Sequence, residues 1–249
     1  MRSYALAKFL IALVITVCFW PVAQAWLPGA NAPVFMTSTT PLPFQPSATP
    51  PVTSRYIMVD TATRILSLYI NENLEKSYHV AVGTRKTPTP IGDFKVVNKD
   101  CNWGTGFGSR WMGLNVPWGI FGIHGTNKPW SIGANASHGC IRMHNRQVEE
   151  LFPLVPEGTP VIIINSKQPY PTLRGRNLRR GMHGQDVVYV QRRLKEIGLY
   201  GELADGRYGT MTQLAISYFQ FLNGCKPSGV VDRPTYDMLM LTVMPKPPV

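Results

Sequence analysis

Apolar and polar residues alternate from position 55 onwards, and this period of two predicts β-strands. The segment RYIMVDTATRILSLYI (55–70) holds two such runs around the polar turn 60–63, so we expect a β-hairpin there. Further strands are predicted at 77–83 and at 159–165, and residues 87–97 are predicted to be a rigid Pro/Gly loop that enters a strand. A short helix is expected in RQVEELF (146–152), with Asn145 as its N-cap. About six strands to one or two helices predict a mainly β domain.

The hydrophobic period changes to that of helices after position 176. Val187, Val190, Leu194 and Ile197 are spaced as one face of an amphipathic helix. A second helix, begun near Thr210 or Thr212, is predicted from Leu214, Ala215, Tyr218, Phe219 and Leu222. A third, from about Pro234, is predicted with Tyr236, Leu239 and Met240 facing inward. Together they predict a small all-α three-helix bundle after the β domain.

The N-terminus begins with Arg2 and Lys8 and continues as an unbroken apolar run of residues, FLIALVITVCFW, ending at Trp20. As a helix this run would be roughly 18 Å long, too short for a hydrocarbon core of about 30 Å. A small-x-small sequence, AQA, ends at Ala25. We therefore expect a signal peptide cleaved after Ala25, with an uncleaved anchor as the alternative.

Two segments are expected to be linkers. Residues 26–53 are rich in Pro, Ser and Thr, carry no charge and show no hydrophobic period. The second, shorter linker is 167–176. The expected organisation is a signal peptide (1–25), a linker (26–53), a folded β domain (54–166), a linker (167–176) and a helical domain (177–242).

The formal net charge of +11 falls to +9 without the leader, which contains two basic residues and no acidic residue. A basic exported protein favours anionic surroundings, such as wall polymers or membrane headgroups, and export makes nucleic acid the weakest candidate. We expect a membrane partner only if the leader stays uncleaved. Of the cysteines, Cys101, Cys140 and Cys225 remain after cleavage, and an odd number leaves a free thiol or an intermolecular bridge. If Cys101 paired with Cys225, Cys140 would be left over.

The segment ASHGCIRMHN (136–145) combines the groups that acyl transfer needs. Only about 3% of an ordinary cysteine is thiolate at neutral pH, so Cys140 requires a base, and an imidazole would form an ion pair with it. Gly139 permits a tight turn that exposes the sulfur and aims the N–H groups of Gly139 and Cys140 at a developing oxyanion. Arg142 would share a face with Cys140 and could hold a substrate carboxylate.

His124, in IHGTN, is the preferred base because it comes from a separate segment and is free to meet the sulfur. His138 lies at i−2 from the cysteine and is poorly placed for that contact. A backbone carbonyl is expected to orient the His124 ring. Two alternatives remain: a zinc site formed by His124, His138, Cys140 and His144, whose spacing matches no common site, and a structural buried cysteine.

The segment IHGTNKPWSIGANASHGCIRMHN closely resembles the signature of the YkuD-like L,D-transpeptidases. The resemblance extends through TPTPIGDF and VPEGTPVIII and covers 54–165. The later segment LRRGMHGQDVVYVQRRLKEIGLY, with DGRYGTMTQLAISYFQ after it, looks like a peptidoglycan-binding domain of the three-helix type. The two resemblances rest on different residues and indicate the same polymer.

The resemblance implies a cysteine-dependent exchange on peptidoglycan stem peptides, with no cofactor and no metal. Cys140 would attack the carbonyl of the L-centre of the third stem residue, expel the terminal D-alanine and form a thioester. An amine of a neighbouring stem would then complete a cross-link. His124 matches the base of the family. The motif positions that line the site are Ser137, His138, Gly139 and Arg142, and the best-matched turn for wall binding is Asp205, Gly206, Tyr208 and Gly209.

Two other functions stay open. Water could replace the acceptor amine, which would make the protein an L,D-carboxypeptidase. The chain could also be a non-catalytic wall-binding protein, although the presence of thiol, imidazole and guanidinium groups together disfavours loss of activity. Under each of these functions the protein is expected in the cell wall or on the extracellular face of the envelope.

Overall fold

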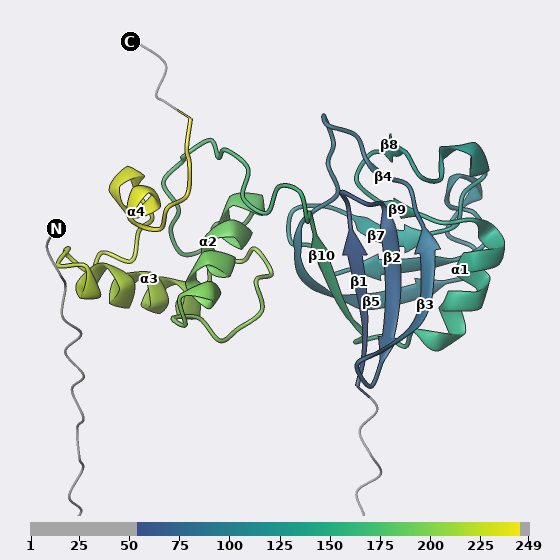
Figure 1. Ribbon diagram of the computed structural model, residues 1–249, viewed down its shortest axis with the longest axis horizontal. Coiled ribbons are helices and arrows are strands. Elements are labelled where there is room, and N and C mark those ends of the chain that lie inside the picture. The colour runs from purple at the N-terminus through teal and green to yellow at the C-terminus, as the bar shows by residue number, and fades with distance from the viewer. Residues whose placement is uncertain (1–53, 245–249) are drawn as a thin grey trace, which may run out of the picture. The chain divides into compact units, whose positions relative to one another are not determined.

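The computed structural model describes residues 54–244, all of which belong to one compact unit, Thr49–Val249. The predicted leader and first linker lie outside the described residues. A curled β-sheet domain comes first, and a helical domain follows (Figure 1). No helix within 54–244 combines the length and the apolar character that crossing a membrane requires.

The first domain is built on an eight-stranded sheet with the strand order β3-β2-β1-β10-β5-β6-β7-β9. The strands are β1 Arg55–Asp60, β2 Ile65–Ile70, β3 Asn73–His79, β4 Val82–Gly83, β5 Gly92–Asp100, β6 Trp111–Leu114, β7 Phe121–His124, β8 Asn135–Ser137, β9 Ile141–Arg142 and β10 Pro160–Ile164. β4 and β8 form a separate parallel pair. The prediction of a mainly β domain followed by a helical bundle is confirmed, with more strands than the sequence pattern indicated.

The predicted hairpin is present as the antiparallel pair of β1 and β2. Its alternating residues Ile57, Val59, Leu66 and Leu68 are completely buried, which explains why the period of two was visible in the sequence. β10 pairs with β1 in parallel, so the first and last strands of the domain are neighbours.

The helix of the first domain, α1 (Asn145–Leu151), begins one residue earlier than predicted. His144 is its N-cap, and no side chain caps the helix. The prediction that Asn145 is the N-cap is wrong, because its side chain is used elsewhere: Oδ1 accepts hydrogen bonds from the backbone N–H groups of Thr126 and Ser109. Three short 3-10 helices are also present, η1 Thr105–Phe107, η2 Pro129–Ser131 and η3 Phe152–Leu154.

The helical domain contains α2 (Gln185–Glu196), α3 (Thr210–Leu222) and α4 (Arg233–Met238), as the pattern predicted. The predicted inward face is only partly right. The residues found buried are Val187, Val190, Leu194, Ala215, Phe219, Tyr236 and Leu239. The residues found exposed, against expectation, are Ile197, Leu214, Tyr218, Leu222 and Met240. On α3 the buried face also includes Ile216, Thr212 and Gln220, so two polar side chains are buried where the hydrophobic pattern would place apolar residues.

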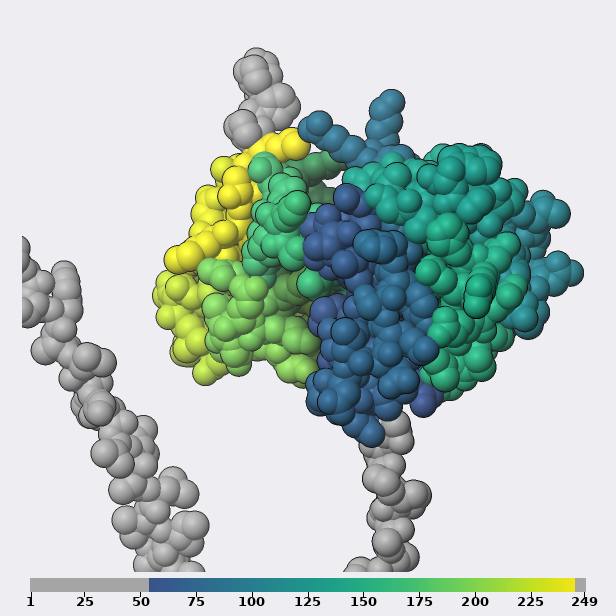
Figure 2. All heavy atoms as spheres, turned by 45° about the vertical axis from the view of Figure 1, so that its right-hand side comes forward, coloured from purple at the N-terminus to yellow at the C-terminus, as the bar shows by residue number. Residues whose placement is uncertain are grey.

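The second predicted linker is partly ordered. Leu173 is buried and its N–H donates to the carbonyl of Thr242. Residues that follow the linker also contact the sheet domain. Asp93 of β5 accepts hydrogen bonds from the side chains of Arg192 and Lys195 and from the N–H of Ala204. Figure 2 shows the surface of both folded parts, with the sheet domain in purple to teal and the helical domain in green to yellow.

Candidate active site

Three neighbouring strands bring the predicted catalytic groups to one face of the sheet. Trp111 of β6 pairs with His124 of β7, and His124 pairs with Arg142 of β9. Cys140 lies two residues before Arg142, and its thiol is next to the backbone N–H of Gly122, two residues before His124. Since paired residues and residues two apart share a face, the thiol, the imidazole and the guanidinium lie together.

The turn before β9 has the tight shape that the sequence predicted. Gly139 has a φ of 117°, a conformation that favours glycine. Its N–H donates to Oγ of Ser137 (3.0 Å), and the Ser137 hydroxyl donates to the carbonyl of Cys140 (2.6 Å). Ser137 therefore hydrogen-bonds to residues on both sides of the turn and holds its shape. Because the N–H of Gly139 is occupied, the N–H of Cys140 is the donor of this turn that could face an oxyanion.

The imidazole of His124 is buried in an aromatic setting. It stacks on Trp111, with ring centroids 5.7 Å apart, and the ring of Phe107 meets it edge-on at 5.1 Å. Nδ1 contacts the carbonyl oxygen of Gly125. A carbonyl can only accept, so Nδ1 carries the proton and Nε2 keeps its lone pair in the neutral ring. The prediction of a backbone orienting group is confirmed.

Burial sets the protonation of both groups. The pKa of His124 is lowered to about 4, mainly by burial and also by the nearby positive charge of Arg142, while the carbonyls of Gly125 and Phe107 act in the opposite direction. Burial also raises the pKa of the Cys140 thiol, an effect that the N–H of Gly122 and the charge of Arg142 oppose. Both shifts favour the neutral thiol and the neutral imidazole at neutral pH over the ion pair expected from the sequence.

Arg142 is half-buried, and one guanidinium N–H donates to the carbonyl of Ala136 (3.2 Å). This bond holds the side chain beside the β8 strand while other donors of the guanidinium stay available. His138 is exposed, and His144 is half-buried at the start of α1. Within 54–244 no group of three or more His, Cys, Asp or Glu side chains is arranged to hold a metal ion. Cys101 and Cys225 are both free and exposed, so the pairing considered from the sequence is not found.

Asn145 is a site residue that the sequence assigned only to helix capping. Its Oδ1 accepts from the N–H of Thr126 (3.0 Å) and of Ser109 (3.3 Å). A Cβ at Gly108 or at Gly125 would come within 2.2 Å of this oxygen, so both glycines are needed for its close approach. Asn145 thereby fixes the loop that follows His124 against the loop that precedes Trp111. Gly108 and Gly125 are the sequence features that could have indicated this contact, but only the fold shows that Asn145 is the residue that approaches them.

The predicted wall-binding turn of the helical domain has mixed exposure. Tyr208 is buried, and its hydroxyl donates to the carbonyl of Gly229. Gly206 is also buried, and its N–H donates to Gln191, while Asp205 is half-buried. Gly209 is exposed at the N-cap of α3. These contacts give the turn a structural role, and its role in wall binding stays a prediction.

Comparison with known proteins identifies the family. A family model described as the L,D-transpeptidase catalytic domain, YkuD, matches residues 54–163, and a model of a peptidoglycan binding domain matches residues 183–239. YqjB of Bacillus subtilis, named as an L,D-transpeptidase, is 32% identical over 154 residues, with 56% of this chain and 82% of that protein covered. The chain belongs to the L,D-transpeptidase family. The resemblance drawn from the cysteine motif is confirmed.

Other L,D-transpeptidase relatives match a shorter part of the chain. YkuD of B. subtilis is 45% identical over 108 residues, covering 43% of this chain and 65% of that protein. YkuD of Bacillus licheniformis is 50% identical over 107 residues, covering 43% and 64%. The chain thus spans just under two thirds of the length of each. Among solved structures, the catalytic domain from E. faecium L,D-transpeptidase is 29% identical, with a TM-score of 0.40 and coverage of 44% and 96%.

Proposed function

We propose that this protein is a cysteine-dependent L,D-transpeptidase that acts on the stem peptides of peptidoglycan through a thioester acyl-enzyme. The observation that carries the proposal is the placement of Cys140 and His124 on one face of the sheet, with the thiol at a glycine-bent turn. Family membership and the match of the C-terminal part to a peptidoglycan binding domain support the choice of polymer.

In the first half-reaction, Sγ of Cys140 attacks the carbonyl carbon of the L-centre of the third stem residue. Nε2 of His124 takes the thiol proton during the attack, since the resting groups are both neutral. The oxyanion forms near the N–H of Cys140, where backbone dipoles stabilise it. The C–N bond to the terminal D-alanine then breaks, and the imidazolium returns its proton to the leaving amine.

In the second half-reaction, the amine of a neighbouring stem attacks the thioester carbonyl and gives its proton to Nε2 of His124. The C–S bond then breaks, and the imidazolium returns the proton to Sγ of Cys140, which restores the thiol. The product joins two third residues. Water in place of the amine would give a shortened stem, which is carboxypeptidase activity. The buried imidazole and the aromatic rings around it reduce the access of water, and this favours the amine as acceptor.

The test is to incubate the protein with a defined disaccharide tetrapeptide, with and without an acceptor peptide, and to identify the products by mass. We expect loss of D-alanine and, with the acceptor present, a dimer joined through third residues. A tripeptide product at all acceptor concentrations would assign the carboxypeptidase reaction instead. An unchanged tetrapeptide would refute both.

We also propose that the helical domain holds the protein on peptidoglycan, which raises the local concentration of stems. A Cβ at Gly209 would meet no atom within 4 Å, and its φ of −87° suits any residue, so Gly209→Trp adds a side chain at the predicted turn without backbone strain. Reduced sedimentation of this variant with insoluble peptidoglycan would support a wall contact at the turn. Sedimentation equal to that of the wild-type protein would contradict the assignment of wall binding to this turn.

The sequence pattern of residues 1–25 supports the further proposal that the protein is exported and works in the cell wall or at the extracellular face of the envelope. The N-terminal residue of protein recovered from the envelope tests this. Trp26 is expected, and Met1 would indicate an uncleaved anchor or no export.

The acid limb of the pH profile is expected to be shifted well below neutrality. The base must be unprotonated, and burial lowers the pKa of His124 to about 4, so it stays competent at pH values where an ordinary histidine is protonated. We expect kcat/KM to be retained at pH 5 and to fall with a midpoint near pH 4. NMR titration of the His124 ring gives an independent value, and a midpoint at or above pH 6.5 would contradict the assignment.

Asn145 is expected to act as a positioning residue. Asn145→Ala removes the acceptor of two backbone N–H groups, and we expect kcat to fall about tenfold as the His124 loop loosens. Asn145→Asp keeps an acceptor oxygen at the same place and is expected to restore most of the activity. Equal losses in both variants, with equal thermal stability, would show that the two hydrogen bonds are not the cause.

A further inference from the structure

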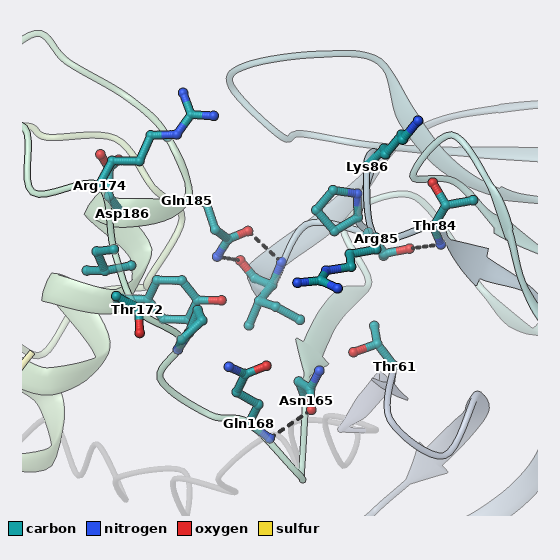
Figure 3. Close-up of a pocket in the computed structure, with 18 of the residues that line it drawn as sticks. Thr61, Thr84, Arg85, Lys86, Asn165, Gln168, Thr172, Arg174, Gln185 and Asp186 are labelled. Atoms are coloured by element: carbon teal, nitrogen blue, oxygen red, sulfur yellow. Dashed lines mark hydrogen bonds between the residues drawn. The ribbon is translucent and has the colours of Figure 1, made fainter. Parts of the chain in front are cut away.

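A large pocket lies between the sheet domain and the segment leading into α2, and none of Cys140, His124 and Arg142 lines it. Its volume is about 1060 Å³, ample for several residues of a peptide. The sheet domain contributes the loop with Arg85 and Lys86, and the other wall includes Arg174 and Gln185 (Figure 3). In the close-up, the Arg85 side chain extends into the space between the two walls.

Hydrogen bonds across the base of the pocket fix the two walls. The Gln185 side chain accepts from the N–H of Ile91 and donates to its carbonyl, both at 2.8 Å. Asp93, two residues on, accepts from Arg192, Lys195 and the N–H of Ala204. A side-chain amide paired with a backbone in this way sets a defined spacing, so the pocket is preformed.

The lining of the pocket is strongly cationic. It includes Arg85, Lys86, Arg174 and Arg176 against a single acid, Asp186. Asp186 is already bound by Arg176 through two hydrogen bonds of 2.6 and 2.9 Å. Within residues 54–244 no salt bridge includes Arg85, Lys86 or Arg174. All three are exposed, and the Arg85 guanidinium is the one of the three that Figure 3 shows directed into the space, where it could meet a carboxylate, the group that a guanidinium matches in geometry.

The pocket shares a wall with the catalytic turn. Strand β4 and Thr84 line it, and the N–H of Thr84 donates to the carbonyl of Ser137 at 3.0 Å. Thr87 of the same loop donates to that carbonyl through its hydroxyl. The Ser137 hydroxyl in turn holds the carbonyl of Cys140. A ligand in the pocket thus lies against the loop that supports the turn bearing the thiol.

We infer that this pocket binds a carboxylate-bearing peptide stem of peptidoglycan, outside the site where acyl transfer takes place. The inference rests on the proposed function for the identity of the polymer. The glycan strand offers neutral hydroxyl and acetamido groups, whereas the stem carries free carboxylates that can pair with Arg85 and the other cations of the lining. The charge of the lining therefore favours the stem over the glycan.

The experiment compares the wild-type protein with the double variant Arg85→Ala/Arg174→Ala. The substrates are a tetrapeptide stem with free carboxylates and the same stem with its side carboxylates amidated. The matched control is Arg180→Ala/Lys226→Ala, which removes two exposed cations outside the pocket. We expect the pocket variant to raise KM about tenfold for the free-carboxylate stem, with kcat within twofold of wild type. The control and the amidated stem should show no such change.

Two arms locate the bound stem. Hydrolysis without an acceptor reports on the donor, and exchange at fixed donor concentration reports on the acceptor; a higher KM in either arm supports the inference. Equal KM values for wild type and pocket variant in both arms would overturn it, as would a fall in kcat alone, which would mean that the loop only supports the turn.

Binding of the tetrapeptide to Cys140→Ala protein, measured by calorimetry, separates the failure of this inference from that of the proposed function. If the wild-type protein releases no D-alanine, the proposed function fails. Weaker binding caused by the pocket substitutions would then still support a stem site, and unchanged binding would exclude it.

Discussion

Replacement of Cys140 by serine is expected to reduce the release of D-alanine by about a thousandfold or more. Loss of a nucleophile removes the covalent route, and the remaining site can only bind and orient the substrate. A serine hydroxyl is nearly isosteric but far less acidic than a thiol, and His124, with a pKa of about 4, is a weak base for it. Initial rates from the mass-resolved tetrapeptide assay measure the effect.

Two matched controls exist in the same chain. Cys101 and Cys225 are exposed and free, so Cys101→Ser and Cys225→Ser repeat the chemical change away from the site and should keep activity within twofold. Intact-mass analysis during turnover adds a direct readout, since the wild-type protein should gain the mass of the acyl group on Cys140 alone. A Cys140→Ser protein as active as these controls would end the proposed mechanism.

The sequence predicted the catalytic pair because its chemistry is local. The thiol follows a glycine, and the histidine comes from a separate strand, so the two groups meet once the sheet forms. The pairing of β7 with β9 brings them together. The protonation state was beyond the sequence, because burial of His124 and Cys140 depends on Phe107, Trp111 and the strands around them. Burial therefore favours neutral groups where the sequence pattern indicated an ion pair.

The errors elsewhere have a common origin in long-range contacts. Asn145 fits a cap by local pattern, yet Thr126 and Ser109 bind its side chain. On α3, Thr212 and Gln220 are buried because each hydrogen-bonds within the domain, while Leu214 and Tyr218 face outward. The period of a helix can be read from sequence without its partner, but the direction of its buried face requires the partner. The cationic pocket had no signal in the sequence, since its two walls are about a hundred residues apart.

The glycine before the thiol should be as sensitive as the thiol itself. A Cβ at Gly139 would lie 2.6 Å from a ring carbon of Phe121 and 3.3 Å from the carbonyl oxygen of Pro88, at a φ of 117°. Gly139→Ala therefore combines backbone strain, of order 1–3 kcal/mol, with a clash that moves the turn or the ring. A displacement of about 1 Å at the nucleophile costs on the order of a hundredfold in rate, so we expect at least that loss in kcat/KM.

Two other glycines of the same domain separate strain from overlap. Gly133 also has a positive φ, 85°, but a Cβ there would meet nothing within 4 Å, and Gly106 has neither feature. Gly133→Ala should lose about 1 kcal/mol of stability with little change in rate, and Gly106→Ala should resemble wild type. Chemical denaturation and kcat/KM measured on the three variants give the comparison. If Gly139→Ala matched Gly133→Ala in both, the turn would tolerate a side chain, and the close packing of Phe121 and Pro88 around it would have no role in placing the sulfur.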